Sequence, residues 1–309
     1  MQGDGHFDGF EGNAQSFRIV SRLSVHRLRN ESFGLDLTAA TLNAILKYPW
    51  MHKMDVPGHQ KFGAYKTDQD AFEYTRKLTP RLGRGQCLEA QIMDHADAIA
   101  YAVHDMIDFY KAGLLPLEDV FKEKGVEIFI SGMTERGRVD KLTQDTGRQL
   151  DDCRESITVM AGKYLTIQQA YGGTREEQYQ MKEISSALIE RYIMAPQIAW
   201  KGKTPRLEIP PKHLEEIAFL KELIWHYIIN RPQLGTQQEG MRHIIRELFS
   251  IYDTTIKEKS GDRRIIPAFF IPEFEEIAGR SGKKFMLRRT RLAIDIVAGF
   301  SDNQAINRE

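Results

Sequence analysis

The chain has 309 residues, of which 41% are hydrophobic and 28% charged, and its 43 Lys and Arg residues balance its 43 Asp and Glu residues. No apolar run approaches the ~20 residues that cross a bilayer, and residues 1–6 have neither the basic start nor the apolar core of a signal peptide. Membrane and secreted proteins are therefore disfavoured. Cys87 and Cys153 are the two cysteines, which excludes a disulfide framework and favours a reducing compartment, so we expect a cytoplasmic protein. The zero formal charge argues against a surface tuned as a whole to nucleic acid.

Helical periodicity dominates the chain from residue 13 onward. Helices are predicted over residues 13–23, 38–48, 69–77, 87–110, 140–164, 175–194, 211–230, 236–252 and 283–300. Thr38 is a suitable N-cap for the second of these. Strand signals are scarce: the best one, at residues 126–130, is short enough to be the start of a helix instead. We therefore predict an all-α fold. The polar, Pro-containing stretch 201–211 is a candidate linker between a domain at 1–200 and a helical region at 201–309.

The longest predicted helix carries an acidic stripe. At 3.6 residues per turn, one face of the helix collects Asp94, Asp97, Tyr101, His104, Asp105 and Asp108. Such a stripe can simply face water, as in most amphipathic helices. It can also line a cavity where carboxylates hold a metal ion, and a cation would offset the repulsion between like charges. The pattern alone favours the solvated face and leaves the metal site open.

Five segments in a fixed order identify a family resemblance. They are Phe-Glu-Gly-Asn-Ala-Gln-Ser-Phe-Arg-Ile-Val at 10–20, Gly-Leu-Asp-Leu-Thr at 34–38, Leu-Lys-Tyr-Pro-Trp at 46–50, Lys-Phe-Gly at 61–63, and Ala-Asp-Ala-Ile-Ala-Tyr at 96–101 with His-Asp at 104–105. Together they resemble the deoxyguanosine triphosphate triphosphohydrolases of the HD-domain superfamily. The resemblance is dense over residues 7–118 and thinner beyond. It implies an HD-domain-like helical bundle with a helical C-terminal extension.

The resemblance also implies an activity. Members of the family convert dGTP and water into deoxyguanosine and triphosphate. A divalent metal ion such as Mg or Mn, held by two histidines and two aspartates, polarises the α-phosphate and lowers the pKa of the attacking water. Relatives are homo-oligomers, so a homo-oligomer is expected here.

Individual positions of the family's site can be carried over. Asp97 matches a metal-ligand aspartate. Six residues match the nucleotide pocket: Asn13, Lys47, Tyr48, Lys61, Tyr101 and Asp105. Without the resemblance, Lys47 would be read as a lysine favoured by the helix dipole, Tyr101 as a core tyrosine and Lys61 as a loop cation.

The other three metal ligands of the family and its catalytic segment precede the motif that here begins at Phe10. We find no counterpart for them, so no catalytic residue is identifiable. His104-Asp105 could be taken as the HD doublet, with His52 or His59 and Asp151 or Asp152 as further ligands. That reading is weaker because it leaves Asp97 unexplained.

Three explanations remain open for the missing ligands: a fragment of a full triphosphohydrolase, a degenerate nucleotide-binding homologue, or a site completed by another polypeptide. We expect the polypeptide alone not to hydrolyse deoxynucleoside triphosphates (dNTPs). The main alternative to an enzyme is a non-catalytic regulatory protein that binds nucleotides or nucleic acid.

A basic run near the C-terminus bears on that alternative. It contains Arg280, Lys283, Lys284, Arg288, Arg289 and Arg291, with apolar residues between them. Such a run could bind a triphosphate tail or single-stranded nucleic acid. The pattern is more typical of a helix with a solvated basic face.

Overall fold

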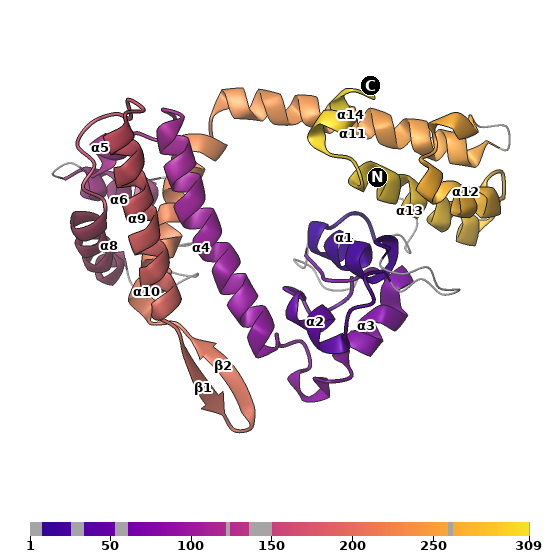
Figure 1. Cartoon of the computed structure of the whole chain (residues 1–309), viewed down its shortest axis with the longest axis horizontal. Helices are drawn as coiled ribbons and strands as arrows, with labels where there is room; N and C mark the ends of the chain where they lie inside the picture. The colour runs from indigo at the N-terminus through magenta and orange to yellow at the C-terminus, as the bar shows by residue number, and fades with distance from the viewer. Residues whose placement is uncertain are drawn as a thin grey trace. The chain divides into compact units, whose positions relative to one another are not determined.

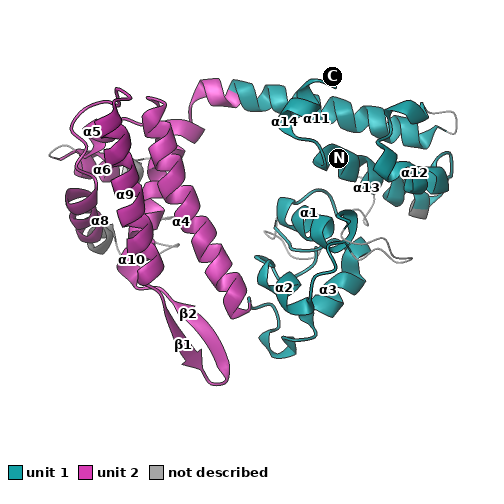
Figure 2. Ribbon diagram, viewed as in Figure 1, with its two compact units in different colours: residues 1–86, 236–309 teal, residues 87–235 magenta. Residues whose placement is uncertain are grey.

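The structure, a computed structural model, describes residues 8–25, 34–52, 61–121, 124–135, 150–258 and 262–308. These residues form a mainly helical protein with a single two-stranded sheet (Figure 1). The predicted all-α class is therefore confirmed, apart from that sheet. The chain divides into two compact units: unit 1 combines residues 1–86 with 236–309, and unit 2 is residues 87–235 (Figure 2).

The first half of unit 1 consists of short helices. They are α1 (Gly12–Arg18), the π-helical turn η1 (Ile19–Leu23), α2 (Ala39–Ala44), α3 (Gln69–Arg76) and the 3₁₀ turns η2 (Lys66–Asp68) and η3 (Pro80–Leu82). Thr38 is the N-cap of α2, as predicted, and its hydroxyl accepts a hydrogen bond from the Thr41 N–H. The apolar side chains of this half bury Phe17, Leu42 and Leu46 in one cluster.

The second half of unit 1 is built on two longer helices. Its elements are α11 (Pro232–Lys257), which begins in unit 2, then η5 (Arg263–Ile265), η6 (Ala268–Phe270), α12 (Ile271–Ile277), α13 (Lys283–Ala298) and α14 (Asp302–Ile306). Tyr252, Ile256, Phe274, Leu292 and Ile296 form the core between α11, α12 and α13. These helices are thus held together by the apolar faces that their periodic apolar residues create.

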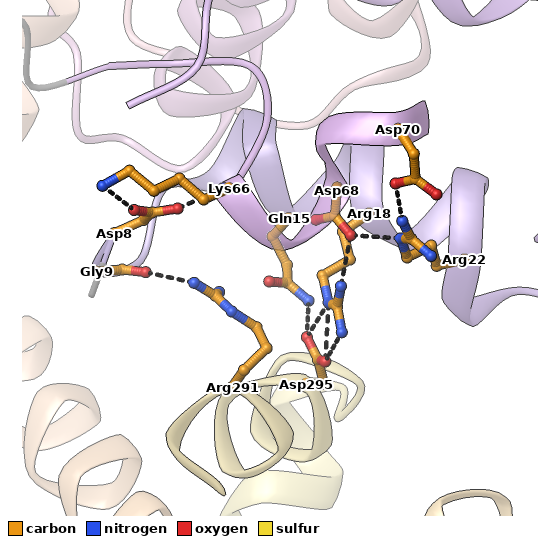
Figure 3. Close-up of polar contacts among 10 residues, drawn as sticks. All are labelled: Asp8, Gly9, Gln15, Arg18, Arg22, Lys66, Asp68, Asp70, Arg291 and Asp295. Carbon is orange, nitrogen blue, oxygen red and sulfur yellow. Dashed lines mark hydrogen bonds and ion pairs between the residues drawn. The ribbon is translucent and has the colours of Figure 1, made fainter. Parts of the chain in front are cut away.

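A buried ion network joins the two halves of unit 1 (Figure 3). Arg18 of α1 donates to Asp68 at 2.6 Å and, through Nε and Nη2, to both carboxylate oxygens of Asp295 in α13 at 2.8–3.0 Å. Gln15 donates a further bond to Asp295 at 2.9 Å. Asp68 and Asp295 are 0% and 1% exposed, so the carboxylates depend on these partners and not on water.

The environment of Arg18 stabilises its protonated, charged form. Burial by itself lowers the pKa of this guanidinium. The hydrogen bond to Asp295 and the charges of Asp295 and Asp68 outweigh burial and raise the pKa above its ordinary value. Arg22 adds a second cation and pairs with both Asp68 and Asp70.

Unit 2 is a helical bundle around α10. Its elements are α4 (Leu88–Lys111), α5 (Leu117–Val120), α6 (Gly125–Glu135), α8 (Leu150–Tyr164), α9 (Arg175–Met194), α10 (Pro211–Ile224) and the π-helical turn η4 (Trp225–Ile229). α10 packs against α4 and α8, and α9 packs on α4. Residues 126–130, the best strand signal, lie in helix α6. None of the helices among the described residues is both long and apolar enough to cross a membrane.

The stretch 201–211, predicted to be a linker, is largely regular structure. Much of it belongs to a β-hairpin, in which β1 (Gln197–Lys201) pairs antiparallel with β2 (Thr204–Glu208). The turn is Gly202-Lys203, and Gly202 has φ +65°, which suits glycine at the first position of a tight hairpin turn. The Leu207 N–H donates to the Gln91 side chain of α4 at 3.0 Å. Because β2 and α10 both pack on α4, the compact units divide at residues 86 and 235 and not at 200.

We expect Arg18→Met to lower the free energy of unfolding of unit 1 by about 3–5 kcal/mol, because it leaves two buried carboxylates without their shared cation. Urea unfolding followed by circular dichroism measures this. Arg264→Met is the matched control, since Arg264 pairs with Asp262 at the surface. Equal unfolding midpoints for the two variants would contradict the structural role of Arg18.

Candidate functional site

Three of the predicted nucleotide-binding residues come together in unit 1. Lys47 and Tyr48 follow α2, and Lys61 returns beside them. The Lys61 Nζ lies 5.8 Å from the centroid of the Tyr48 ring, within the range of a cation–π contact. The Gln86 side chain donates to the Lys47 carbonyl at 3.0 Å and holds that turn of the backbone. Lys61 is exposed, and Lys47 and Tyr48 are half-buried.

Trp50 joins the two segments that carry these lysines. Its indole Nε1–H donates to the Lys61 carbonyl at 2.9 Å, and the Gly63 N–H donates to the Trp50 carbonyl at 2.9 Å. The Trp50 ring meets the Tyr48 ring edge to face, with centroids 5.4 Å apart. A Cβ at Gly63 would lie 2.1 Å from the Tyr48 carbonyl oxygen, so only glycine permits this approach of the two backbones.

The resulting cluster suits a phosphorylated ligand. Lys47 and Lys61 are flexible point charges, which can neutralise a polyphosphate without a fixed geometry. Tyr48 offers an aromatic ring beside them, and aromatic rings stack on sugars and bases.

Asn13, the fourth pocket residue predicted in unit 1, is engaged in a helix cap. Its amide donates to Glu11 Oε1 at 2.9 Å, while Glu11 Oε2 accepts from the Ala14 N–H at 3.0 Å and caps α1. The Tyr65 hydroxyl bonds to the backbone of the same Glu11. Asn13 is therefore fixed in place by the start of α1.

The remaining predicted residues lie on α4 in unit 2. Asp97, Tyr101 and Asp105 follow one another at intervals of four residues along one face of the helix. Asp97 is exposed, Tyr101 is 38% exposed and Asp105 is half-buried. The Lys221 Nζ of α10 lies 5.8 Å from the centroid of the Tyr101 ring.

Burial and neighbouring charges shift the pKa of two of these side chains, Tyr101 and Asp105. Burial raises the pKa of the Tyr101 phenol, and the charges of Asp105 and Glu222 raise it further, so the hydroxyl stays protonated as a donor. Burial also raises the pKa of Asp105. The neighbouring charge of Asp108 adds to that rise, and His104 opposes it.

The seven predicted site residues are thus divided between the units. Asn13, Lys47, Tyr48 and Lys61 belong to unit 1, and Asp97, Tyr101 and Asp105 to unit 2.

The described residues do not fit the expected metal centre. Catalytic metal sites use three or more protein ligands, and across the described ranges no group of three His, Cys, Asp or Glu side chains is placed to hold a metal ion. Of the alternative ligands, His59 lies outside the described residues, and so do the side chains of Asp151 and Asp152.

The basic run on α13 is largely neutralised within unit 1. Arg288 forms a two-bond pair with Glu276, and Arg289 donates to Asp253 at 2.9 Å. Arg291 is 4% exposed, and its guanidinium lies 3.5 Å from the centroid of the Tyr65 ring. Arg280 lies over the ring of Phe285. These arginines bind other parts of the unit, which weakens the case for a nucleic-acid surface; the side chains of Lys283 and Lys284 lie outside the described residues.

Comparison with known proteins shows which family the chain is similar to. A sequence profile of the phosphohydrolase-associated domain matches residues 207–309. A deoxyguanosinetriphosphate triphosphohydrolase-like protein of Corynebacterium glutamicum is 41% identical over 279 residues, which cover 82% of this chain and 59% of the relative. The corresponding protein of Streptomyces coelicolor is 31% identical over 260 residues, covering 78% of this chain and 57% of the relative. The chain resembles the deoxyguanosinetriphosphate triphosphohydrolase-like family.

The family resemblance seen in the sequence is therefore confirmed. A third member of the dGTPase-like family, from Corynebacterium diphtheriae, is 27% identical over 317 residues, which cover 96% of this chain and 68% of the relative. The chain spans a little more than half the length of the Streptomyces relative. The profile match at 207–309 includes α13, whose Asp295 binds Arg18 in the N-terminal motif.

Sequence reasoning missed Trp50, Gly63 and Gln86 as parts of this site. Trp50 and Gly63 stand within the matched segments 46–50 and 61–63, so a signal was present. Their role depends on contacts between the two segments, and single-segment patterns do not reveal such contacts.

We predict that Asp108→Asn lowers the pKa of Asp105 toward its ordinary value. The substitution removes a negative charge that disfavours ionisation of Asp105. Carboxyl chemical shifts followed by NMR during a pH titration measure the change. Asp119→Asn, elsewhere in unit 2, is the control and should leave the Asp105 titration unchanged. An Asp105 titration curve identical in the wild type and Asp108→Asn would show that the two carboxylates do not interact.

Proposed function

We propose that this chain binds a deoxynucleoside triphosphate through Lys47, Tyr48 and Lys61. The observation that carries the proposal is the contact of Lys61 with the Tyr48 ring, next to Lys47 in sequence. In this assignment the lysines neutralise the triphosphate, and Tyr48 packs against the sugar or the base. The names of the relatives support dGTP as the nucleotide.

The second set of residues is proposed to contact the same nucleotide class. Tyr101, kept protonated by burial and by Asp105, can donate a hydrogen bond to the sugar. Asp105 accepts from a sugar hydroxyl while ionised. Asp97 is proposed as the ligand of a divalent metal ion, on the family resemblance alone.

The associated reaction is hydrolysis of dGTP to deoxyguanosine and triphosphate. Water adds to the α-phosphorus, the bond to the 5′ oxygen breaks, and that oxygen takes a proton and leaves as the nucleoside. The step needs an activated water, and a metal ion supplies that activation in the family. Because the described residues hold no group of three potential metal ligands, we propose that residues 1–309 alone bind dGTP without hydrolysing it.

A non-catalytic regulatory role is the second candidate, and the same observation favours it. A regulatory homologue would need a nucleotide-binding cluster and no catalytic metal, and within the described ranges no three potential metal ligands come together. The paired arginines of α13 make nucleotide a better candidate ligand than single-stranded nucleic acid.

We expect Lys47→Ala and Lys61→Ala each to weaken dGTP binding by about tenfold, the loss of one charge-assisted hydrogen bond. Isothermal titration calorimetry of residues 1–309 with dGTP measures the Kd. Lys203→Ala, in the exposed hairpin turn of unit 2, is the matched control and should bind like the wild type. Wild-type affinity in both lysine variants would rule out this cluster as the nucleotide site.

We also expect no release of triphosphate when homogeneous residues 1–309 are incubated with dGTP and Mn or Mg. Anion-exchange chromatography of the products measures this. Stoichiometric deoxyguanosine and triphosphate would show that the chain contains a complete catalytic site. Deoxyguanosine and triphosphate added to a reaction without protein provide the positive control for their detection.

A further inference from the structure

Trp50 is the residue that most tightly joins the two lysine-bearing segments. Its indole N–H donates to the Lys61 carbonyl at 2.9 Å. Its own carbonyl accepts from Gly63, and its own N–H donates to the Tyr48 carbonyl at 2.8 Å. Its ring packs on the edge of Tyr48. One side chain and its backbone thus contact both partners of the Lys61–Tyr48 pair.

The backbones of the Tyr48 and Gly63 segments lie too close together for a side chain at position 63. The absent side chain of Gly63 leaves room for the Tyr48 carbonyl, and Met51 pairs with Ala64 as an isolated parallel bridge. The fold therefore fixes the neighbours of Lys61 on its C-terminal side. The indole bond of Trp50 acts on the carbonyl of Lys61 itself.

Fixing this backbone matters because a lysine side chain is flexible. The ammonium can move on a four-carbon stem, so the position of the Cα limits where the charge can be placed. Among aromatic side chains of this size, Trp alone provides a ring N–H donor. Phenylalanine at position 50 would keep the ring contact with Tyr48 and lose the bond to Lys61.

We propose that Trp50 is a positioning residue for the nucleotide: its indole N–H holds the Lys61 backbone so that the Lys61 ammonium stays over the Tyr48 ring. This inference rests on the proposed nucleotide site. Trp50 acts through Lys61 and is not assigned a contact with the ligand.

The first test is Trp50→Phe in residues 1–309, with the dGTP Kd measured by calorimetry and the unfolding midpoint by thermal denaturation. We expect the Kd to rise by about threefold to tenfold, the effect of one hydrogen bond, with a folded protein. Trp200→Phe is the matched control because Trp200 is 69% exposed on the hairpin of unit 2. It should leave the dGTP Kd unchanged.

A double-mutant cycle separates positioning from general support of the fold. If Trp50 acts through Lys61, Trp50→Phe should raise the Kd in the wild-type background and have no further effect in Lys61→Ala. An equal rise in both backgrounds would overturn the positioning role.

The cycle also separates this proposal from the nucleotide site itself. A wild-type Kd in Lys61→Ala would overturn the positioning role, and a wild-type Kd in Lys47→Ala as well would overturn the site. A weakened Lys61→Ala with an unchanged Trp50→Phe would overturn the positioning role alone. Should Trp50→Phe fail to fold, Gly63→Ala provides the second test, with Lys203→Ala as its control. Gly63→Ala should weaken dGTP binding because its Cβ forces the Tyr48 and Lys61 segments apart, and Lys203→Ala should bind like the wild type. Wild-type affinity in Gly63→Ala would overturn the proposal.

Discussion

Arg18 carries its charge inside unit 1, where Asp68 and Asp295 are its anionic partners. A charge removed from water is tolerated when counter-charges and hydrogen bonds surround it, and here they come from opposite ends of the chain. The pairing requires α1 and α13 to lie against each other. The same α1 contributes Phe17 to the apolar cluster that also buries Leu42 of α2 and Leu46, the residue before Lys47. Helix α1 thus connects the buried ion network to the segment that carries the candidate site.

Regular helices were the most predictable part of this fold. Their apolar period and their caps are local properties, so α3, α4, α9 and α13 lie close to the predicted ranges, and Thr38 caps α2 as expected. The β-hairpin was missed because its strands are five residues each and contain polar residues typical of a linker. The division into units could not be predicted, since it depends on side chains that meet from distant parts of the sequence.

The candidate site shows the same limit. The family resemblance points to Lys47, Tyr48 and Lys61, and the structure places the Lys61 ammonium 5.8 Å from the centroid of the Tyr48 ring. Trp50, Gly63 and Gln86 could not be assigned to the site in this way. The indole of Trp50, for example, bonds to the carbonyl of Lys61, which lies in a different segment of the sequence. The basic run on α13 shows the converse. Its charge pattern suggests a binding surface, yet Arg288 and Arg289 are paired with acidic residues of α12 and α11, which no local pattern reveals.

The bond between Arg18 and Asp295 joins residues 277 positions apart. During synthesis the ribosome releases Arg18 long before Asp295 exists, whereas unit 2 is a continuous stretch of the chain, residues 87–235. Domains generally fold as units while the chain emerges, and contacts between distant residues form late. Unit 2 can therefore complete its core on the ribosome, while the N-terminal segment, although made first, acquires the second counter-charge of Arg18, Asp295, last. In the interval, the side of Arg18 that faces α13 in the folded unit remains in water.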